Sequence, residues 1–291
     1  MIPNSILITG AKGQLGSELQ LLAEQYPQYQ FLFTDREELS IDDENAVRDF
    51  FGKYPIGFCI NCAAYTAVDK AETDITISNS INGDAPGILA AVCKDFNAAF
   101  IHISTDYVFD GTATVPYQET DAVSPVNLYG ASKLLGEQLA LKNNPDTIII
   151  RTSWVYAPHG NNFVKTMLRL MKERDSLSVV SDQQGCPTYA ADLASAIMQI
   201  VVQLPNINSE RPYIFHYSNQ GPITWHHFAE TIAQLSGSAC VVHPIPTSAY
   251  PTPAKRPAYS VMNTQKIQST FNITIPYWKD SLAICLKRLG V

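Results

Sequence analysis

Three regularly spaced glycines follow an apolar segment near the start of the chain, and they restrict the fold more than any other feature. Ser5–Thr9 predicts a buried strand, and Gly10, Gly13 and Gly16 come directly after it. Glycine in such a pattern serves a tight turn, the close approach of a pyrophosphate to the backbone, and packing of the next helix on a sheet. Because only 15 of the 291 residues are glycine, the spacing is specific. It predicts an anion site at a helix N-terminus.

The first 150 residues alternate short apolar segments with longer amphipathic ones, as in strand–helix–strand units around a parallel sheet. The strands are almost wholly apolar, as in a sheet that helices cover on both faces. We therefore predict an α/β fold with a Rossmann-type, doubly wound parallel sheet. The predicted strands are Ser5–Thr9, Gln30–Thr34, Phe58–Asn61, Ala98–Ser104 and Thr147–Arg151, and the predicted helices are Gln14–Glu24, Glu44–Lys53, Pro86–Phe96 and Leu128–Lys142.

This alternation weakens after Arg151. We predict a dinucleotide-binding domain over residues 1–152, to which 188–218 returns, and a smaller mixed α/β domain over 153–291 that binds the substrate. A proline-rich stretch from Pro244 to Pro257 reads as an ordered loop of that second domain. The elements predicted after Arg151 are helices Asn162–Glu173, Tyr189–Gln203, Thr224–Ser236 and Tyr277–Leu289, with a strand at Tyr213–Tyr217.

The composition excludes several classes of protein. Acidic residues outnumber basic ones by 27 to 20, which gives a net charge of −7 and disfavours binding to nucleic acid. The longest membrane-like stretch, Ala194 to Leu204, is far shorter than the roughly 18 residues of a membrane span. The first residues lack the basic region of a signal peptide, and six cysteines do not suggest a disulfide scaffold. We expect a cytoplasmic protein without nucleic-acid or membrane partners.

Two charged residues at the end of the second predicted strand bear on the choice of dinucleotide. Asp35 lies 19 residues after Gly16, where an acidic side chain binds the ribose hydroxyls of the adenosine. Arg36 follows immediately and could pair with a 2′-phosphate instead. NADH and NADPH therefore both remain possible.

A tyrosine and a lysine carry the predicted chemistry. Tyr129 and Lys133 are four residues apart in a predicted helix and so share one face. A nearby ammonium lowers the pKa of a phenol from about 10 and makes it a usable acid. Thr105 lies at the carboxyl end of the fourth predicted strand, where α/β sheets bind ligands. Thr105, Tyr129 and Lys133 together have the form of a reductase site.

Seven segments carry a family resemblance, which extends from residue 6 to beyond residue 260. They are Gly10–Gly16, Asn61–Glu72, Ser104–Gly111, Pro125–Lys133, Arg151–Tyr156, Gly160–Phe163 and Pro251–Pro257. With them the chain resembles the extended short-chain dehydrogenase/reductases and, among these, the dTDP-4-dehydrorhamnose reductase family. The resemblance implies reduction of the 4-keto group of dTDP-4-dehydro-L-rhamnose with NADPH or NADH, by a monomer or a homodimer.

The resemblance also implies roles for individual residues. Tyr129 would protonate the keto oxygen while a hydride arrives from the nicotinamide, and Lys133 would hold the nicotinamide ribose and tune the tyrosine. The pyrophosphate would be contacted by Gly13, Gln14 and Leu15, the adenosine ribose by Asp35, the middle of the cofactor by Ala64, Tyr65 and Thr66, and the sugar by Thr105, Asp106 and Trp154. We add Arg256, because a guanidinium in the second domain suits a nucleotide pyrophosphate.

The chain departs from the family pattern at two places. Some members dimerise through a metal that glutamates bind; Glu18 matches one of these positions, but Ala191 stands at another, so we expect no metal site. Ser40 in Leu39–Ile41 replaces a frequent aspartate, which puts one adenosine contact in question.

Two other functions remain open on the sequence alone. A sugar-nucleotide dehydratase or 4-epimerase shares the fold, but dehydratases carry a Thr-Asp-Glu run where this chain has Thr105, Asp106 and Tyr107. A regulatory subunit would use the fold to bind a partner enzyme without turnover. His102, inside a predicted strand, is interpreted as a packed neutral histidine rather than a base.

Overall fold

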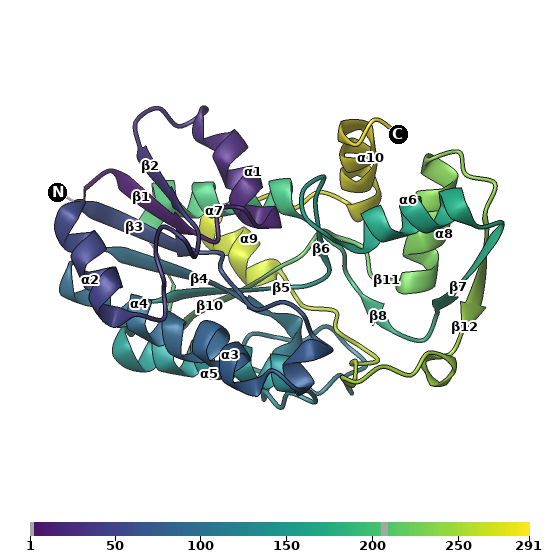
Figure 1. Cartoon of the computed structure of the whole chain (residues 1–291), viewed down its shortest axis with the longest axis horizontal. Coiled ribbons are helices and arrows are strands. Elements are labelled where there is room, and N and C mark those ends of the chain that lie inside the picture. Colours follow the sequence, from purple (N-terminus) through teal and green to yellow (C-terminus); the bar gives the residue numbers. More distant parts are fainter. Residues whose placement is uncertain (1–2, 205–208) are drawn as a thin grey trace.

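A six-stranded parallel sheet forms the centre of the molecule (Figure 1). The computed structural model describes residues 3–204 and 209–291. The strand order is β10-β5-β4-β3-β1-β2. The chain adds β2 on one side of β1 and the later strands on the other side, so the order of strand addition switches between β1 and β3. This confirms the predicted Rossmann-type fold, in which ligands bind beyond the carboxyl ends of the strands. The strands are β1 (Ser5–Thr9), β2 (Gln30–Thr34), β3 (Ile56–Asn61), β4 (Ala99–Thr105), β5 (Ile148–Thr152) and β10 (Tyr213–Tyr217).

Helices cover both faces of the sheet (Figure 1). One face carries α1 (Gln14–Ala23), α7 (Ala190–Gln203) and α9 (Gln265–Phe271), and the other carries α2 (Glu44–Lys53), α4 (Ala85–Asp95) and α5 (Leu128–Asn143). Neighbouring residues of one strand point to opposite faces: Ile6 and Ile8 belong to the core under α1, while Leu7 belongs to the core under α2. Because both faces of each central strand are buried, nearly every residue of these strands is apolar.

The segment between β3 and α4 contains helical turns that the sequence pattern does not predict. They are η1 (Lys70–Glu72), α3 (Ile75–Asn79) and η2 (Ser80–Asp84), and η2 continues directly into α4. Ile75 and Ile77 are exposed on this segment, so its apolar residues do not mark a buried face. The helical pattern therefore becomes clear only at α4.

The remaining C-terminal elements pack around a second core (Figure 1). It lies between α6 (Phe163–Glu173), α8 (Trp225–Leu235) and α10 (Trp278–Arg288), and β7 (Ser176–Val180) pairs in parallel with β12 (Val241–Ile245). Thr224 caps α8, as its position predicts, by accepting a hydrogen bond from the His227 N–H. Short pairs complete this part: β6 (Val155–Tyr156) with β9 (Thr188–Tyr189), and β8 (Gln184–Gly185) with β11 (Ile223–Thr224).

None of the helices in the described ranges, 3–204 and 209–291, combines the length and apolar character that crossing a bilayer requires.

A buried ion pair joins α5 to the sheet. Arg151 of β5 donates two hydrogen bonds to Glu137, from Nε at 2.9 Å and from Nη2 at 2.7 Å, and the Ser104 hydroxyl donates to the same carboxylate at 2.5 Å. Both charged side chains are 3% exposed. Breaking such a pair leaves an uncompensated charge in the core.

We therefore expect Arg151→Met to lower the free energy of unfolding by about 3–5 kcal/mol, because Glu137 would stay buried without its cation. Arg48→Met is the matched control, since Arg48 pairs with Glu44 and Asp95 at the surface, and it should cost less than about 1 kcal/mol. Urea denaturation followed by circular dichroism measures both values. Equal losses of unfolding free energy in Arg151→Met and Arg48→Met would contradict the larger cost that we expect for breaking the buried pair.

Candidate active site

A cleft of about 900 Å³ opens at the carboxyl ends of the central strands. It is bounded by the glycine turn after β1, the ends of β2 to β5, the start of α5, residues 152–163 and Trp225 of α8. Most of the residues predicted to contact a cofactor or substrate lie on its wall. These are Gly10, Gly13, Gln14, Leu15, Asp35, Arg36, Ala64, Thr66, Thr105, Asp106, Tyr129, Lys133 and Trp154.

The glycine turn forms a cradle that larger residues would fill. Gly10 has a φ of +65°, and a Cβ atom there would lie 2.6 Å from the backbone nitrogen of Ala63. Gly13 is the N-cap of α1 and has no side chain to occupy the helix terminus. A Cβ on Gly16 would lie 2.4 Å from the Gly10 carbonyl oxygen, so Gly16 serves packing of α1 on the turn and does not line the cleft. The cradle fits a pyrophosphate.

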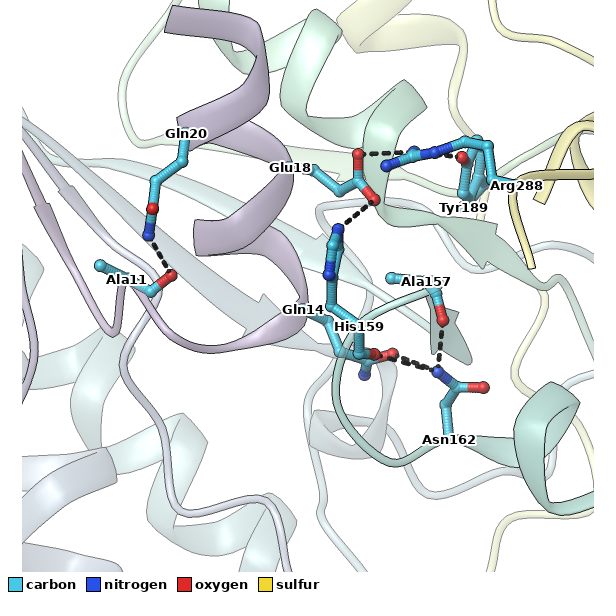
Figure 2. Close-up of polar contacts among 9 residues, drawn as sticks. All are labelled: Ala11, Gln14, Glu18, Gln20, Ala157, His159, Asn162, Tyr189 and Arg288. Carbon is cyan, nitrogen blue, oxygen red and sulfur yellow. Dashed lines mark hydrogen bonds and ion pairs between the residues drawn. The ribbon is translucent and has the colours of Figure 1, made fainter. Parts of the chain in front are cut away.

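A loop from the C-terminal part closes over the start of α1 (Figure 2). Asn162, the N-cap of α6, donates a hydrogen bond to Gln14 Oε1 at 2.8 Å and another to the Ala157 carbonyl at 2.8 Å. Gln14 thus connects the glycine turn with residues 157–162, on the opposite wall of the cleft. A pyrophosphate that contacts the Gln14 side chain, as predicted, would compete with Asn162 for it.

Glu18, which matches a metal-binding glutamate of some family members, has a different partner here. Its carboxylate is 3% exposed and accepts a hydrogen bond from Arg288 of α10 at 2.8 Å, with His159 at 3.6 Å on its other oxygen (Figure 2). The Tyr189 hydroxyl contacts the same guanidinium. The positive charge beside Glu18 therefore comes from an arginine of the chain itself.

The end of β2 and the loop that follows it place two carboxylates and a guanidinium on the wall of the cleft. Asp35 and Arg36 both line it, as the sequence predicts. Ser40 lines it too, and its hydroxyl donates to Asp42 Oδ1 at 2.6 Å. The Ser40 and Ser80 hydroxyls lower the pKa of Asp42, which also faces the cleft. The sequence does not predict that Asp42 faces the cleft, because Asp42 lies in a loop beside Asp43, whose side chain caps α2.

Tyr65 and Arg256 do not line the cleft. The Tyr65 hydroxyl donates to Asp74 Oδ2 at 2.7 Å, so this side chain holds the loop after β3. Both terminal nitrogens of Arg256 donate to the carboxylate of Asp69, each at 2.8 Å. A nucleotide phosphate would have to compete with this carboxylate for Arg256, which instead ties the proline-rich loop to residue 69.

Thr105, Tyr129 and Lys133 meet in the cleft because of where β4 ends and α5 begins. Asn127 caps α5 by accepting from the Gly130 N–H at 2.8 Å, which sets Tyr129 in the first turn with Lys133 one turn on. Thr105 is the last residue of β4, and its hydroxyl donates to Asp106 Oδ1 at 2.9 Å. The three side chains predicted for catalysis thus share one wall of the cleft.

The electrostatics of this group differ from the sequence expectation. Burial raises the pKa of Tyr129 to about 12, a hydrogen bond with Thr105 opposing the rise. Burial also lowers the pKa of Lys133 to about 8, and Lys133 Nζ donates to the Ile103 carbonyl at 2.7 Å. Desolvation therefore dominates the pKa of the phenol, and the expected lowering of this pKa by the lysine is not found. The tyrosine is protonated at neutral pH, as a proton donor must be.

Asp106 and an aromatic pair lie in the same cleft as Thr105, Tyr129 and Lys133. Burial raises the pKa of Asp106 to about 6, and the hydrogen bond that Thr105 donates to Oδ1 opposes the rise. Asp106 Oδ2 has no hydrogen-bond partner among the described residues. Trp154, with a φ of +49°, stacks on Trp225 with ring centroids 3.5 Å apart. Trp225 lines the cleft but was not predicted, because at the start of α8 nothing in the sequence separates it from a core tryptophan.

The family model described as RmlD substrate binding domain matches residues 4–291. The chain belongs to this family. Within the family, it is 40% identical to the dTDP-4-dehydrorhamnose reductase of Burkholderia thailandensis over 98% of each chain. Among solved structures, it is similar to the Clostridium acetobutylicum dTDP-4-dehydrorhamnose reductase, with a TM-score of 0.93 and 40% identity over 99% of this chain and 100% of that one.

A second solved structure in the family bears on the cofactor. The dTDP-4-dehydrorhamnose reductase of Bacillus anthracis, in complex with NADP, has a TM-score of 0.92 and 36% identity over 98% of this chain and 99% of that one. NADP in that relative and the glycine cradle in this chain support a nicotinamide dinucleotide as the cofactor.

Gly10→Ala should weaken NADPH binding about tenfold or more, because the new Cβ would meet the backbone of Ala63 and the φ of +65° strains an alanine. The turn must shift to relieve this contact, and a displaced cradle that loses about 1.4 kcal/mol of binding free energy binds tenfold more weakly. Fluorescence titration with NADPH measures the effect. Gly52→Ala is the control: a Cβ at Gly52 meets no atom within 4 Å, and affinity should stay at the wild-type value. Unchanged binding by Gly10→Ala would contradict the cradle.

Proposed function

We propose that this protein is a dTDP-4-dehydrorhamnose reductase, which reduces the 4-keto group of dTDP-4-dehydro-L-rhamnose with NADPH or NADH. The observation that carries the proposal is the meeting of Thr105, Tyr129 and Lys133 in the cleft that begins at the glycine cradle. The names of the relatives at about 40% identity support the substrate. We also propose that residues 1–152 with 188–218 hold the dinucleotide and that 153–291 hold the sugar nucleotide.

The residues of the cleft have different roles in the reaction. The reduced cofactor supplies a hydride when it is bound. Tyr129 donates its phenolic proton to the keto oxygen, so that the carbonyl becomes a hydroxyl and the tyrosine a phenolate. Thr105 orients the phenol and the carbonyl. The free Oδ2 of Asp106 accepts a hydrogen bond from a sugar hydroxyl, and the Trp154 ring packs against the sugar.

Tyr129→Phe should lower kcat by about 10²–10⁴-fold, the contribution typical of a positioned acid, while NADPH affinity stays near the wild-type value. The assay follows the loss of NADPH absorbance with dTDP-4-dehydrorhamnose as substrate. Tyr107→Phe is a matched control, since this neighbour packs edge-on against Tyr129. A kcat of Tyr129→Phe close to the wild-type value would contradict the role of Tyr129 as proton donor.

The same assay separates the reductase from the other functions. A regulatory subunit would bind NADPH without oxidising it, and wild-type protein that turns over no substrate would favour that function. A dehydratase or epimerase would convert its sugar nucleotide without net oxidation of NADPH.

Asp35 and Arg36 should have opposite effects on the two cofactors. We propose that Asp35 binds the ribose hydroxyls of NADH and that Arg36 binds the 2′-phosphate of NADPH. Arg36→Ala should raise KM for NADPH about tenfold, or roughly 1.4 kcal/mol, and leave KM for NADH nearly unchanged. Asp35→Ala should raise KM for NADH and not that for NADPH. Parallel changes in both KM values would contradict the assignment.

A further inference from the structure

Two segments whose side chains have no role in the proposed function meet at the N-terminus of α5. The first, 69–72, contains η1 and its N-cap Asp69, in the loop after β3. The second, 254–256, belongs to the proline-rich stretch of the C-terminal part. Hydrogen bonds join these segments to each other and to the start of α5. Because α5 carries Tyr129 in its first turn, the contacts bear on the geometry of the proton donor.

Two side chains cap the first turn of α5. The N-terminus of a helix presents N–H groups that have no partner inside the helix. Glu72 Oε1 accepts from the Leu128 N–H at 2.9 Å, and Asn127 Oδ1 accepts from the Gly130 N–H at 2.8 Å. A carboxylate also suits the positive end of the helix dipole. Tyr129 lies between the two anchored residues, so its backbone is held on both sides.

The segment 254–256 reaches both of these caps. The Lys255 carbonyl accepts from Asn127 Nδ2 at 2.8 Å. The terminal nitrogens of Arg256 donate to the two carboxylate oxygens of Asp69, each at 2.8 Å. Asp69 is the N-cap of the turn that ends at Glu72. The loop therefore contacts one cap directly and the other through Asp69.

The ion pair between Arg256 and Asp69 holds the loop in one orientation. The Ala254 N–H donates to Asp69 Oδ1 at 3.1 Å, and Arg256 Nη1 also donates to the Ala254 carbonyl at 2.8 Å. The arginine lowers the pKa of Asp69, so the carboxylate is charged at neutral pH. Bidentate pairs of this kind fix direction as well as distance. Because both side chains remain partly exposed, the pair contributes little to global stability.

A small shift of the first turn would change the geometry of the proton donor. This turn lies directly on the chain that follows β4, because a Cβ on Gly130 would overlap the Tyr107 carbonyl oxygen. The Tyr129 hydroxyl shares a hydrogen bond with Thr105, so the two side chains are in contact only while the turn keeps its place. A displacement of about 1 Å in a catalytic group can cost about 10²-fold in rate.

We propose that Asp69, Glu72, Asn127 and Arg256 are positioning residues, which join the proline-rich loop to the first turn of α5 and so set Tyr129 for proton transfer. The loop belongs to the part that we assign to the sugar nucleotide, and the proton donor is in place while this loop is docked. The inference rests on the proposed function and deepens it. It gives Arg256 an effect on kcat in place of the phosphate contact that the sequence led us to expect.

Hydrogen exchange tests the link in the protein alone. In Arg256→Met and in Asp69→Ala, the Leu128 and Gly130 amides should exchange about tenfold faster than in the wild type, because the first turn opens more readily once the loop is released. Arg169→Met is the matched control: it removes an exposed ion pair on α6 and should leave these two exchange rates unchanged. Wild-type exchange rates in Arg256→Met and Asp69→Ala would overturn the inference, whether or not the protein is a reductase.

Steady-state kinetics separate positioning from a phosphate contact. Arg256→Met and Asp69→Ala should each lower kcat about tenfold or more, while KM for the sugar nucleotide and Kd for NADPH stay near the wild-type values. The double variant should lose no more than either single one, because both cut the same link. If Arg256 binds a substrate phosphate instead, Arg256→Met raises KM, and Asp69→Ala, which frees the guanidinium, does not. That pattern would overturn the inference. A wild-type protein without activity would contradict the proposed function and leave the exchange measurements valid.

Conservative variants test the two caps. Glu72→Gln keeps an oxygen that accepts from the Leu128 N–H, so its kcat should stay near the wild-type value, whereas Glu72→Ala should lower kcat about tenfold or more. Asn127→Ser keeps an N-cap but loses the donor to the Lys255 carbonyl, and its kcat should fall as in Arg256→Met. Urea denaturation accompanies each assay. Lower urea midpoints together with an unchanged kcat of the folded variants would assign these residues to stability alone and overturn the inference.

Discussion

The close approach of two backbone segments at the carboxyl edge of the sheet determines the geometry of this site. Gly10 leaves β1 in a left-handed conformation against the backbone of Ala63, and the Cys62 N–H donates to the Thr9 carbonyl at 3.2 Å. This contact holds the ends of β1 and β3 together beside the N-terminus of α1, where residues of the turn and of β3's end line the cleft. It also places Thr9 and Asn61 side by side, and the Thr9 hydroxyl donates to Asn61 Oδ1 at 2.7 Å.

The site combines a fixed electrostatic field with groups that titrate. The protein carries a net charge of −7, yet its expected ligands are anionic, so local sources must supply the positive potential. The N–H groups at the start of α1 supply part of it and do not change with pH. Lys133 and Asp106, in contrast, have pKa values displaced by burial to about 8 and about 6. The part of the potential that the α1 N-terminus supplies therefore does not depend on the protonation of Lys133 or Asp106.

Much of the fold follows from local sequence, and the rest depends on contacts between distant segments. β1, β2, β10 and α2 have the predicted bounds, because buried parallel strands are continuously apolar and α2 has a clear cap. The sequence does not reveal the β7–β12 pair, because paired residues such as Ser176 and Val241 are 65 positions apart and β12 contains a proline and exposed residues.

The residues of the candidate site also fall into those that local sequence predicts and those that depend on distant contacts. The glycine turn, Thr105, Tyr129 and Lys133 have characteristic spacing, and the structure places them together. Asp42 and Trp225 reach the cleft through loop and helix packing that no local pattern encodes. The sequence does not disclose the carboxylate that holds Arg256, because Asp69 lies 187 residues away in the chain. Likewise, the register that aligns His102 with Asn61 arises only when the strands pair.

The Glu18–Arg288 pair has a consequence for the order in which the molecule assembles. These residues are 270 positions apart, so a carboxylate on the first helix is neutralised only when α10 docks. Closing a loop of this length costs entropy before the contact contributes any stability. The buried carboxylate on the helix that follows the glycine turn is therefore paired with Arg288 only in a chain whose C-terminal helix is docked, which links the two ends of the sequence at one ion pair.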